Sequence, residues 1–177
     1  MQPTAEQFTE KAWTAIMSAQ QLAQNRRHQQ LESEHLLRAL LDQEGLAARI
    51  LDKAGVSPPA LQTAVDSYLS QQPSLSNAPD SVFLGKGLNA LLDQAESLKQ
   101  SYGDSFISIE HLLLALADDG RCGRQLLGQA GTDTSRLKTA INAVRGSQKV
   151  TDQNPEGTYE SLEKYGRDLT SAARDGK

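Results

Sequence analysis

Apolar residues recur along most of the chain at intervals of three and four positions, the spacing that places them on one face of an α-helix. The first such run follows Thr4-Ala5-Glu6-Gln7, in which Thr and Gln stand at the positions of a capping box. We therefore predict that a long helix starts just after Thr4 and contains Thr9. Its apolar face would consist of Phe8, Ala12, Ala15, Ile16, Ala19, Leu22 and Ala23.

Three shorter helices are predicted to follow. The second covers about residues 33–41 and begins with acidic side chains, which suit the positive end of a helix dipole. The third covers about 46–54 and stops at Gly55, because glycine commonly ends helices. The fourth opens with Ser57 as N-cap and Pro58 in the first turn, where proline is tolerated. Together these helices form a four-helix unit.

The same pattern occurs twice. A shift of 76 positions aligns residues 8–69 with 84–145 without a gap, and 16 of the 62 pairs are identical. The most similar segment is Glu34–Leu40 against Glu110–Leu116. One unit of this size has a marginal core alone, whereas two units can bury a common face. The predicted fold class is therefore all-α, a tandem repeat of two four-helix units in one pseudo-twofold globule, followed by a flexible linker and a terminal helix.

Two polar stretches divide the chain. The first, 72–82, is rich in Pro, Ser and Asn and connects the two units. The second, 146–158, contains two glycines and a proline, which indicates a flexible segment. The predicted domains are the double repeat at 1–146, with repeat one at 5–71 and repeat two at 83–146, a flexible linker at 147–158, and the start of a junction at 159–177.

Composition narrows the functions that are open to this fold. The formal net charge of −4 gives no reason to expect broad attraction to nucleic acid or to anionic lipid. Apolar runs such as Leu112–Leu116 are far too short to span a bilayer. The first residues lack the pattern of a secretory signal, so the expected location is the cytoplasm. The single cysteine, Cys122, is expected to be a small, partly buried apolar residue.

The sequence shows no motif of a catalytic or metal site. A phosphate-binding loop of the form G-x-x-x-x-G-K-[ST] is approached only at Gly85-Lys86-Gly87, where Gly87 replaces the Ser or Thr that would bind magnesium. The pairs Glu34-His35 and Glu110-His111 are adjacent in sequence, so on a helix their side chains diverge by about 100° instead of converging on a metal. We expect each His to cap or pack at a helix start, and we expect this chain to be no enzyme.

These motifs carry a resemblance to a known family. Phe8-Thr9-Glu10-Lys11-Ala12, the paired Glu-His-Leu-Leu-x-Ala-Leu motifs and the paired Ala-Gly helix ends resemble the Clp N-terminal repeat domain. The resemblance covers residues 5–146. The segment 162–170 is similar to the junction that leads into the first ATPase domain of ClpB-type disaggregases.

The resemblance implies a substrate-binding module of an ATP-dependent disaggregase. It implies that the domain sits on a hexameric ring, weakly captures exposed apolar segments of unfolded or aggregated polypeptides, and hands them to the pore. ATP and Mg would bind in domains of the parent protein, and none of its cofactors would bind in this fragment. The implied partners are such polypeptides, the parent's own AAA+ ring and a DnaK-type chaperone, with neither nucleic acid nor membrane. The alternative is the adaptor-docking domain of a protease-coupled ClpA- or ClpC-type protein.

The resemblance also implies six substrate-binding residues. Family positions that are linked to activity correspond here to Thr9, Asp104 and Glu110. An apolar groove near the first helix of repeat two would be lined by Leu92 and Leu98. The residues themselves also allow a structural interpretation, since Glu110 lies in a first helical turn and Asp104 follows a glycine in a turn. The sixth is His111, at a position where the family's disaggregases often carry Leu.

Overall fold

The computed structural model of the chain describes residues 1–155 and Tyr159, so most of the predicted junction lies outside the described residues. The described part is all-α, as predicted, with two very short strands. Its helices are α1 (Glu10–Asn25), α2 (Ser33–Asp42), α3 (Leu46–Lys53), α4 (Pro58–Ser70), α5 (Lys86–Ser101), α6 (Ile109–Ala117), α7 (Gly123–Gln129) and α8 (Thr134–Arg145), preceded by a 3-10 turn η1 (Ala5–Gln7), and its strands are β1 (Gln30–Leu31) and β2 (Phe83–Leu84).

The predicted start of the first helix was wrong. The capping box at Thr4 closes the short turn η1, and α1 begins six residues later, at Glu10. Between them the backbone at Phe8 is extended and forms a parallel bridge with Ile107, so a tertiary contact separates the two helical segments. Thr9 is therefore the N-cap of α1, accepts a hydrogen bond from the Ala12 N–H at 3.3 Å, and is fully buried.

The pseudo-twofold arrangement is confirmed by the way the repeats pair. Strand β1 of repeat one lies parallel to β2 of repeat two, with Leu31 opposite Leu84. The bridge between Phe8 and Ile107 is the counterpart of that pair, because adding 76 to 8 gives 84 and subtracting 76 from 107 gives 31. Each repeat thus contributes the same two positions to the contact with the other.

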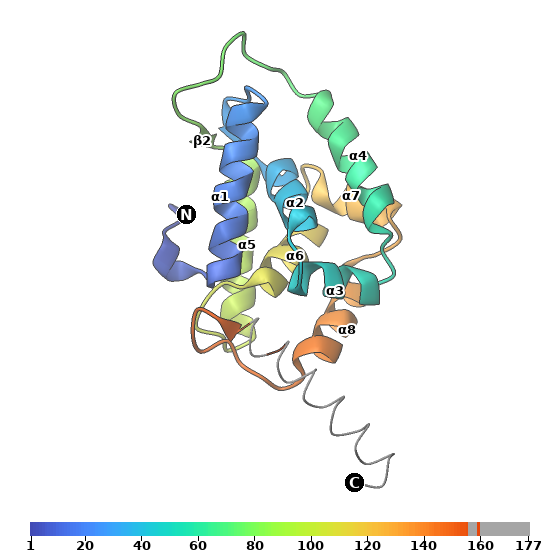
Figure 1. Ribbon diagram of the computed structural model, residues 1–177. Helices are drawn as coiled ribbons and strands as arrows, with labels where there is room; N and C mark the ends of the chain where they lie inside the picture. Colours follow the sequence, from blue (N-terminus) through green and yellow to red (C-terminus); the bar gives the residue numbers. More distant parts are fainter. Residues whose placement is uncertain (156–158, 160–177) are drawn as a thin grey trace, which may run out of the picture.

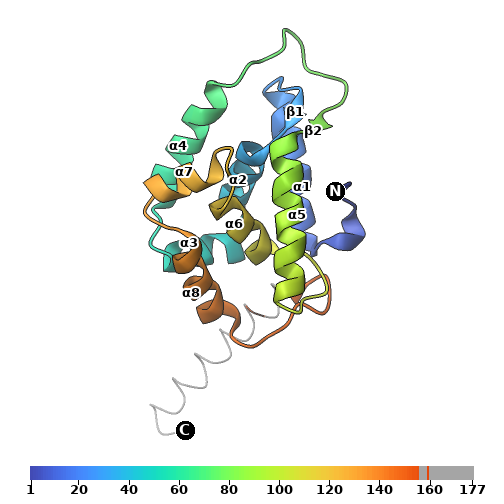
Figure 2. The same cartoon turned by 180° about the vertical axis from the view of Figure 1, so that it is seen from behind.

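The helices interlock around two central ones. α2 and α6 are buried along almost their entire length, while α1 runs down one face of the molecule (Figure 1) and α5 down the opposite face (Figure 2). Across the repeats, α3 packs against α8 and α7 packs against α4. A single hydrophobic core therefore runs through both units. No helix in the described part of the chain is long and apolar enough to cross a bilayer.

The segment after α8 returns to the body of the domain. In Figure 1 the orange loop that leaves α8 crosses the base of the molecule toward the start of α1. Val150 is fully buried, and its carbonyl accepts a hydrogen bond from the Ser105 N–H at 2.7 Å. The Gln153 carbonyl accepts another from the Glu10 N–H at 2.7 Å. We expected a flexible linker here, and its described part is instead attached to both repeats; the domain boundaries themselves stay a prediction.

Candidate functional site

Two equivalent polar clusters lie at the starts of α2 and α6. His35 and His111 each occupy the third helical position, and each ring Nδ1 accepts the backbone N–H of the N-cap residue. The distances are 2.9 Å from the Glu32 nitrogen and 2.8 Å from the Ser108 nitrogen. Both rings are buried. The prediction that each His caps or packs at a helix start is thus confirmed.

In repeat two, His111 faces a carboxylate. Because Nδ1 accepts a hydrogen bond, Nε2 carries the ring proton and donates it to Asp104 Oδ2 at 2.8 Å. Arg145 donates to both oxygens of Asp104, at 2.7 and 2.9 Å. Burial by itself raises the pKa of Asp104, but the hydrogen bonds from His111 and Arg145 outweigh it and hold that pKa well below its usual range.

Arg145 also joins the second acidic group of this cluster. Its Nη1 donates to Glu110 Oε2 at 3.0 Å, and both side chains are almost completely buried. The other oxygen, Oε1 of Glu110, is buried without a hydrogen-bond partner among the described residues. Sequence reasoning missed Arg145 because its counterpart in repeat one is Leu69, so the repeat gave no signal for it.

In repeat one, His35 faces a second histidine. His28 stands at the position equivalent to Asp104, and its Nδ1 lies 2.8 Å from His35 Nε2. Since His35 Nδ1 accepts from Glu32, its Nε2 proton donates to His28. Burial lowers the pKa of His35 to about 4, although the nearby Glu34 carboxylate acts in the opposite direction. This pair is therefore neutral near pH 7.

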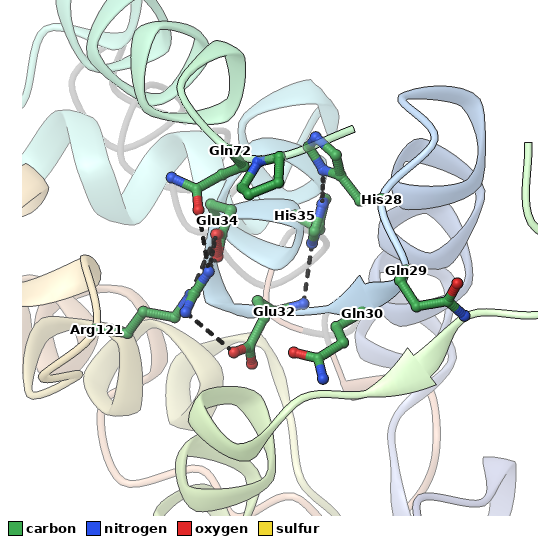
Figure 3. Close-up of a pocket in the computed structure, with 9 residues that line it drawn as sticks. His28, Gln29, Gln30, Glu32, Glu34, His35, Gln72 and Arg121 are labelled. Atoms are coloured by element: carbon green, nitrogen blue, oxygen red, sulfur yellow. Dashed lines mark hydrogen bonds and ion pairs between the residues drawn. The ribbon is translucent and has the colours of Figure 1, made fainter. Parts of the chain in front are cut away.

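A pocket of about 190 Å³ opens beside this histidine pair (Figure 3). The guanidinium of Arg121, which comes from repeat two, binds Glu34 at 2.8 and 3.0 Å and approaches Glu32 at 3.3 Å. Glu32 also accepts the Leu88 N–H, at the start of α5, at 2.8 Å. The pocket is lined by His28, Gln29, Gln30, Glu32, Glu34, His35, Gln72, Pro73 and Arg121.

The structure gathers three of the six predicted binding residues, Asp104, Glu110 and His111, into one buried cluster. Thr9 lies on the strand-like segment that pairs with Ile107, two residues after the turn η1, and donates its N–H to the Ile107 carbonyl.

The two leucines lie elsewhere. Leu92 is fully buried in the core, and Leu98 is partly buried against it. Leu92 therefore does not line a surface groove in this structure. The role of all six residues in binding stays a prediction. The large apolar side chains that are most exposed in the described part of the chain are Met17, Leu75 and Phe83.

Neither cluster is arranged for metal-based chemistry. Within residues 1–155 and Tyr159, no group of three His, Cys, Asp or Glu side chains is placed to hold a metal ion. Cys122 is buried, and burial raises the pKa of its thiol far above the ordinary value, so little of it is thiolate near pH 7. The clusters can therefore hold backbone amides and charged groups, and we assign no bond-making step to them.

Comparison with known proteins gives a consistent family. The sequence profile of the Clp repeat (R) N-terminal domain matches residues 7–127. Chaperone protein ClpB 1 of Parasynechococcus marenigrum is 68% identical over 177 residues, which is all of this chain and 20% of that protein. The chain thus spans about a fifth of the length of the curated relatives that it matches.

Solved structures show the same fold. The Hsp104 N-terminal domain from Candida albicans superposes with a TM-score of 0.74 at 26% identity, covering 85% of this chain and 99% of that one. A complex of the ClpV N-domain with a VipB peptide has a TM-score of 0.62 at 20% identity and covers 77% of this chain and 85% of that one.

Proposed function

The chain belongs to the Clp repeat N-terminal domain family, in its ClpB type, and from this we propose that it is the substrate-binding module of an ATP-dependent protein disaggregase. In this proposal the domain weakly captures exposed apolar segments of unfolded or aggregated proteins in the cytoplasm and hands them to the pore of a hexamer. ATP and Mg act in other domains of the parent protein, which cooperates with a DnaK-type chaperone. The observation that carries the proposal is the 68% identity to a ClpB chaperone over the whole chain.

The surface of the domain supports weak and general binding. Phe83 exposes 60% of its surface and Met17 exposes 40%, whereas the pocket beside His35 is polar and already holds Arg121. A few apolar contacts give modest affinity, because each factor of ten requires about 1.4 kcal/mol. Weak binding suits a client that must move on to a pore, and several copies on one ring raise the effective concentration.

Titration with an unfolded protein tests this proposal. Fluorescently labelled α-lactalbumin, reduced and carboxymethylated so that it cannot fold, is titrated with the 177-residue chain while its anisotropy is followed. We expect saturation with a Kd of about 0.1 mM, equivalent to about 5.5 kcal/mol. Native α-lactalbumin is the matched control and should not bind. A flat anisotropy for the unfolded protein up to millimolar domain would refute the proposal.

Docking of one defined partner is the second candidate. It is favoured by the ClpV N-domain, which has this fold and has been solved with a VipB peptide. Competition separates the two functions. If unrelated unfolded proteins displace labelled α-lactalbumin with similar potency, general capture of clients is supported. If none competes and a single folded protein binds at one-to-one stoichiometry, docking is the better description.

A further inference from the structure

We propose that residues 147–153, termed the strap, occupy a binding site for an extended polypeptide segment on repeat two, with Val150 standing where an apolar client residue binds. The strap opens while the helices stay folded, and a client segment then takes its place. The identity of the ligand as a client rests on the proposed function, whereas the opening of the strap does not.

The contacts of Val150 are those of a bound peptide residue. Its N–H donates to Asp104 Oδ1 at 2.9 Å, and its carbonyl accepts the Ser105 N–H at 2.7 Å. Its side chain is fully buried. The site thus offers one acceptor and one donor to the backbone of a single residue and buries the side chain of that residue, which is how an extended segment is held by its backbone and selected by its side chain.

The groups beneath the strap explain why a carboxylate serves as the acceptor. Asp104 is kept ionised by Arg145, which also donates to the Gln148 carbonyl of the strap at 2.7 Å. A charged acceptor forms a stronger hydrogen bond to a backbone N–H than a neutral one does. The Glu110 carboxylate lies on the same guanidinium, and its second oxygen is buried without a partner among the described residues. The cluster can therefore accept a further donor when the strap is replaced.

The strap is attached in a way that allows it to leave. Among its seven residues only Val150 is buried, and the others are exposed. Its residues form no helix of their own. Its hydrogen bonds run to Asp104 and Ser105, to the Tyr102 carbonyl, to the N–H of Glu10, to the carbonyls of Ala5 and Phe8, and to Arg145 at the end of α8. Segments with few buried apolar contacts open at lower free energy than the core does. The strap therefore behaves as an internal competitor of the client.

Amide hydrogen exchange of the 177-residue chain tests the opening. The N–H groups of Ser105, Val150 and Glu10 report the opening of the strap. The N–H of Leu112 in α6, which donates to the Ser108 carbonyl, reports the opening of the core. We expect the three strap amides to exchange at one common opening rate, faster than that of Leu112. Val150→Ala removes two buried methyl-sized groups and should speed the strap amides about tenfold. Leu112 should not change.

Binding of reduced, carboxymethylated α-lactalbumin tests the ligand. The apparent Kd equals the intrinsic Kd divided by the fraction of molecules in which the strap is open. Because Val150→Ala raises that open fraction, it should lower the apparent Kd by about three- to tenfold. Asp104→Asn should open the strap as well but raise the Kd, since it weakens the acceptor that the client needs. Thr151→Ala, at an exposed position of the strap, is the matched control and should change neither quantity.

Each outcome decides a part of the proposal. If Val150→Ala opens the strap and leaves the Kd unchanged, the strap does not cover the client site, although the proposed function stands. If no variant binds the unfolded protein, both the proposed function and the assignment of a client as the ligand are refuted. Hydrogen exchange then tests the opening of the strap by itself. Strap amides that exchange only at the rate of Leu112 would show that no separate opening exists.

Discussion

The two Glu-His clusters start from the same motif and end in opposite environments. In repeat two, Asp104, His111 and Glu110 surround the buried Arg145 of their own repeat, and the strap closes over them. In repeat one the equivalent His35 faces a neutral histidine, and the guanidinium that pairs with its neighbouring glutamate comes from the other repeat and is 33% exposed. A pocket borders each cluster, but the Arg145 side chain is only 3% exposed, so the first cluster is buried and the second is partly open to water.

The comparison of the two clusters shows which features the two repeats share and which features differ between them. The histidine that satisfies the N-cap amide is present in both repeats, since an unpaired buried N–H is costly in either. The groups that compensate the buried carboxylates are not repeated. Arg145 corresponds to Leu69, and Arg121 corresponds to Gly45. The hydrogen bond from the N-cap amide to the histidine is therefore the same in both repeats, whereas the arginines that pair with the carboxylates differ.

A second exchange concerns the caps themselves. The N-cap of α2 is Glu32, and the N-cap of α6 is the shorter Ser108. A methyl group on Gly85 would lie 2.2 Å from the Glu32 carboxylate, so only glycine fits there. The position equivalent to Gly85 is Thr9. A long cap thus occurs with glycine opposite it, and a short cap occurs with threonine.

The largest effect is expected from the buried arginine. Arg145→Met leaves the carboxylates of Asp104 and Glu110 buried without a cation, and should lower the free energy of unfolding by about 3–5 kcal/mol. Arg121→Met, the counterpart at the open pocket, should lower it by only about 1–2 kcal/mol because water reaches that site. Urea unfolding at pH 7 measures both. Equal losses would contradict the contrast between a buried arginine and a partly exposed one.

The next effect is a pH dependence from His35. Its pKa is lowered from 6.5 to about 4 in the folded state, so the unfolded state binds the proton first as the pH falls. The contribution of neutral His35 to the free energy of unfolding is fully present above pH 6.5 and is lost as the pH falls from 6.5 to 4. The loss amounts to about 2–3 kcal/mol. His35→Asn retains an acceptor for the Glu32 N–H but does not titrate. Urea unfolding at pH 7.5 and 4.5 should show a smaller loss in this variant, and an unchanged loss would count against the assignment.

A somewhat smaller effect is expected from the caps. Gly85→Ala should cost about 2 kcal/mol because the Glu32 carboxylate must move away from the Leu88 N–H. Gly120→Ala, where an added Cβ meets no atom within 4 Å, should stay within about 0.5 kcal/mol. Shortening the cap should rescue the variant, so Glu32→Ser combined with Gly85→Ala is expected to cost less than the sum of the two. Thermal unfolding checks this, and strict additivity would exclude direct contact as the cause.

The smallest effect separates the last helices of the two repeats. Asp133 caps α8 by accepting the Arg136 N–H at 2.8 Å, whereas Ser57 at the start of α4 makes no side-chain cap bond. Asp133→Ala should therefore cost about 1 kcal/mol, and Ser57→Ala should cost less than about 0.5 kcal/mol. The urea concentration at the midpoint of unfolding resolves a difference of this size. A larger loss for Ser57→Ala would reverse the assignment.

Most of the fold was predictable from sequence, because it depends on local signals that occur twice. The helix starts and ends at Gly55, Ser57 and the two histidines follow from capping and periodicity. The start of α1 was not predictable, since Phe8 leaves the helix only to pair with the distant Ile107.

The site was predictable only in part. Asp104, Glu110 and His111 came from the family resemblance, and the structure brings them together. Arg121 and Arg145 were missed because their partners lie 87 and 35 or 41 positions away in sequence. The attachment of the strap depends likewise on contacts between distant segments, in a stretch whose composition resembles that of a linker.

A map of amide chemical shifts tests most directly that clients bind repeat two. The ¹⁵N-labelled chain is titrated with reduced, carboxymethylated α-lactalbumin. We predict saturable shifts at Ser105 and across 147–153, with small changes around 28–35 and at Arg121. Shifts confined to 28–35 and Arg121, with an undisturbed strap, would contradict the account.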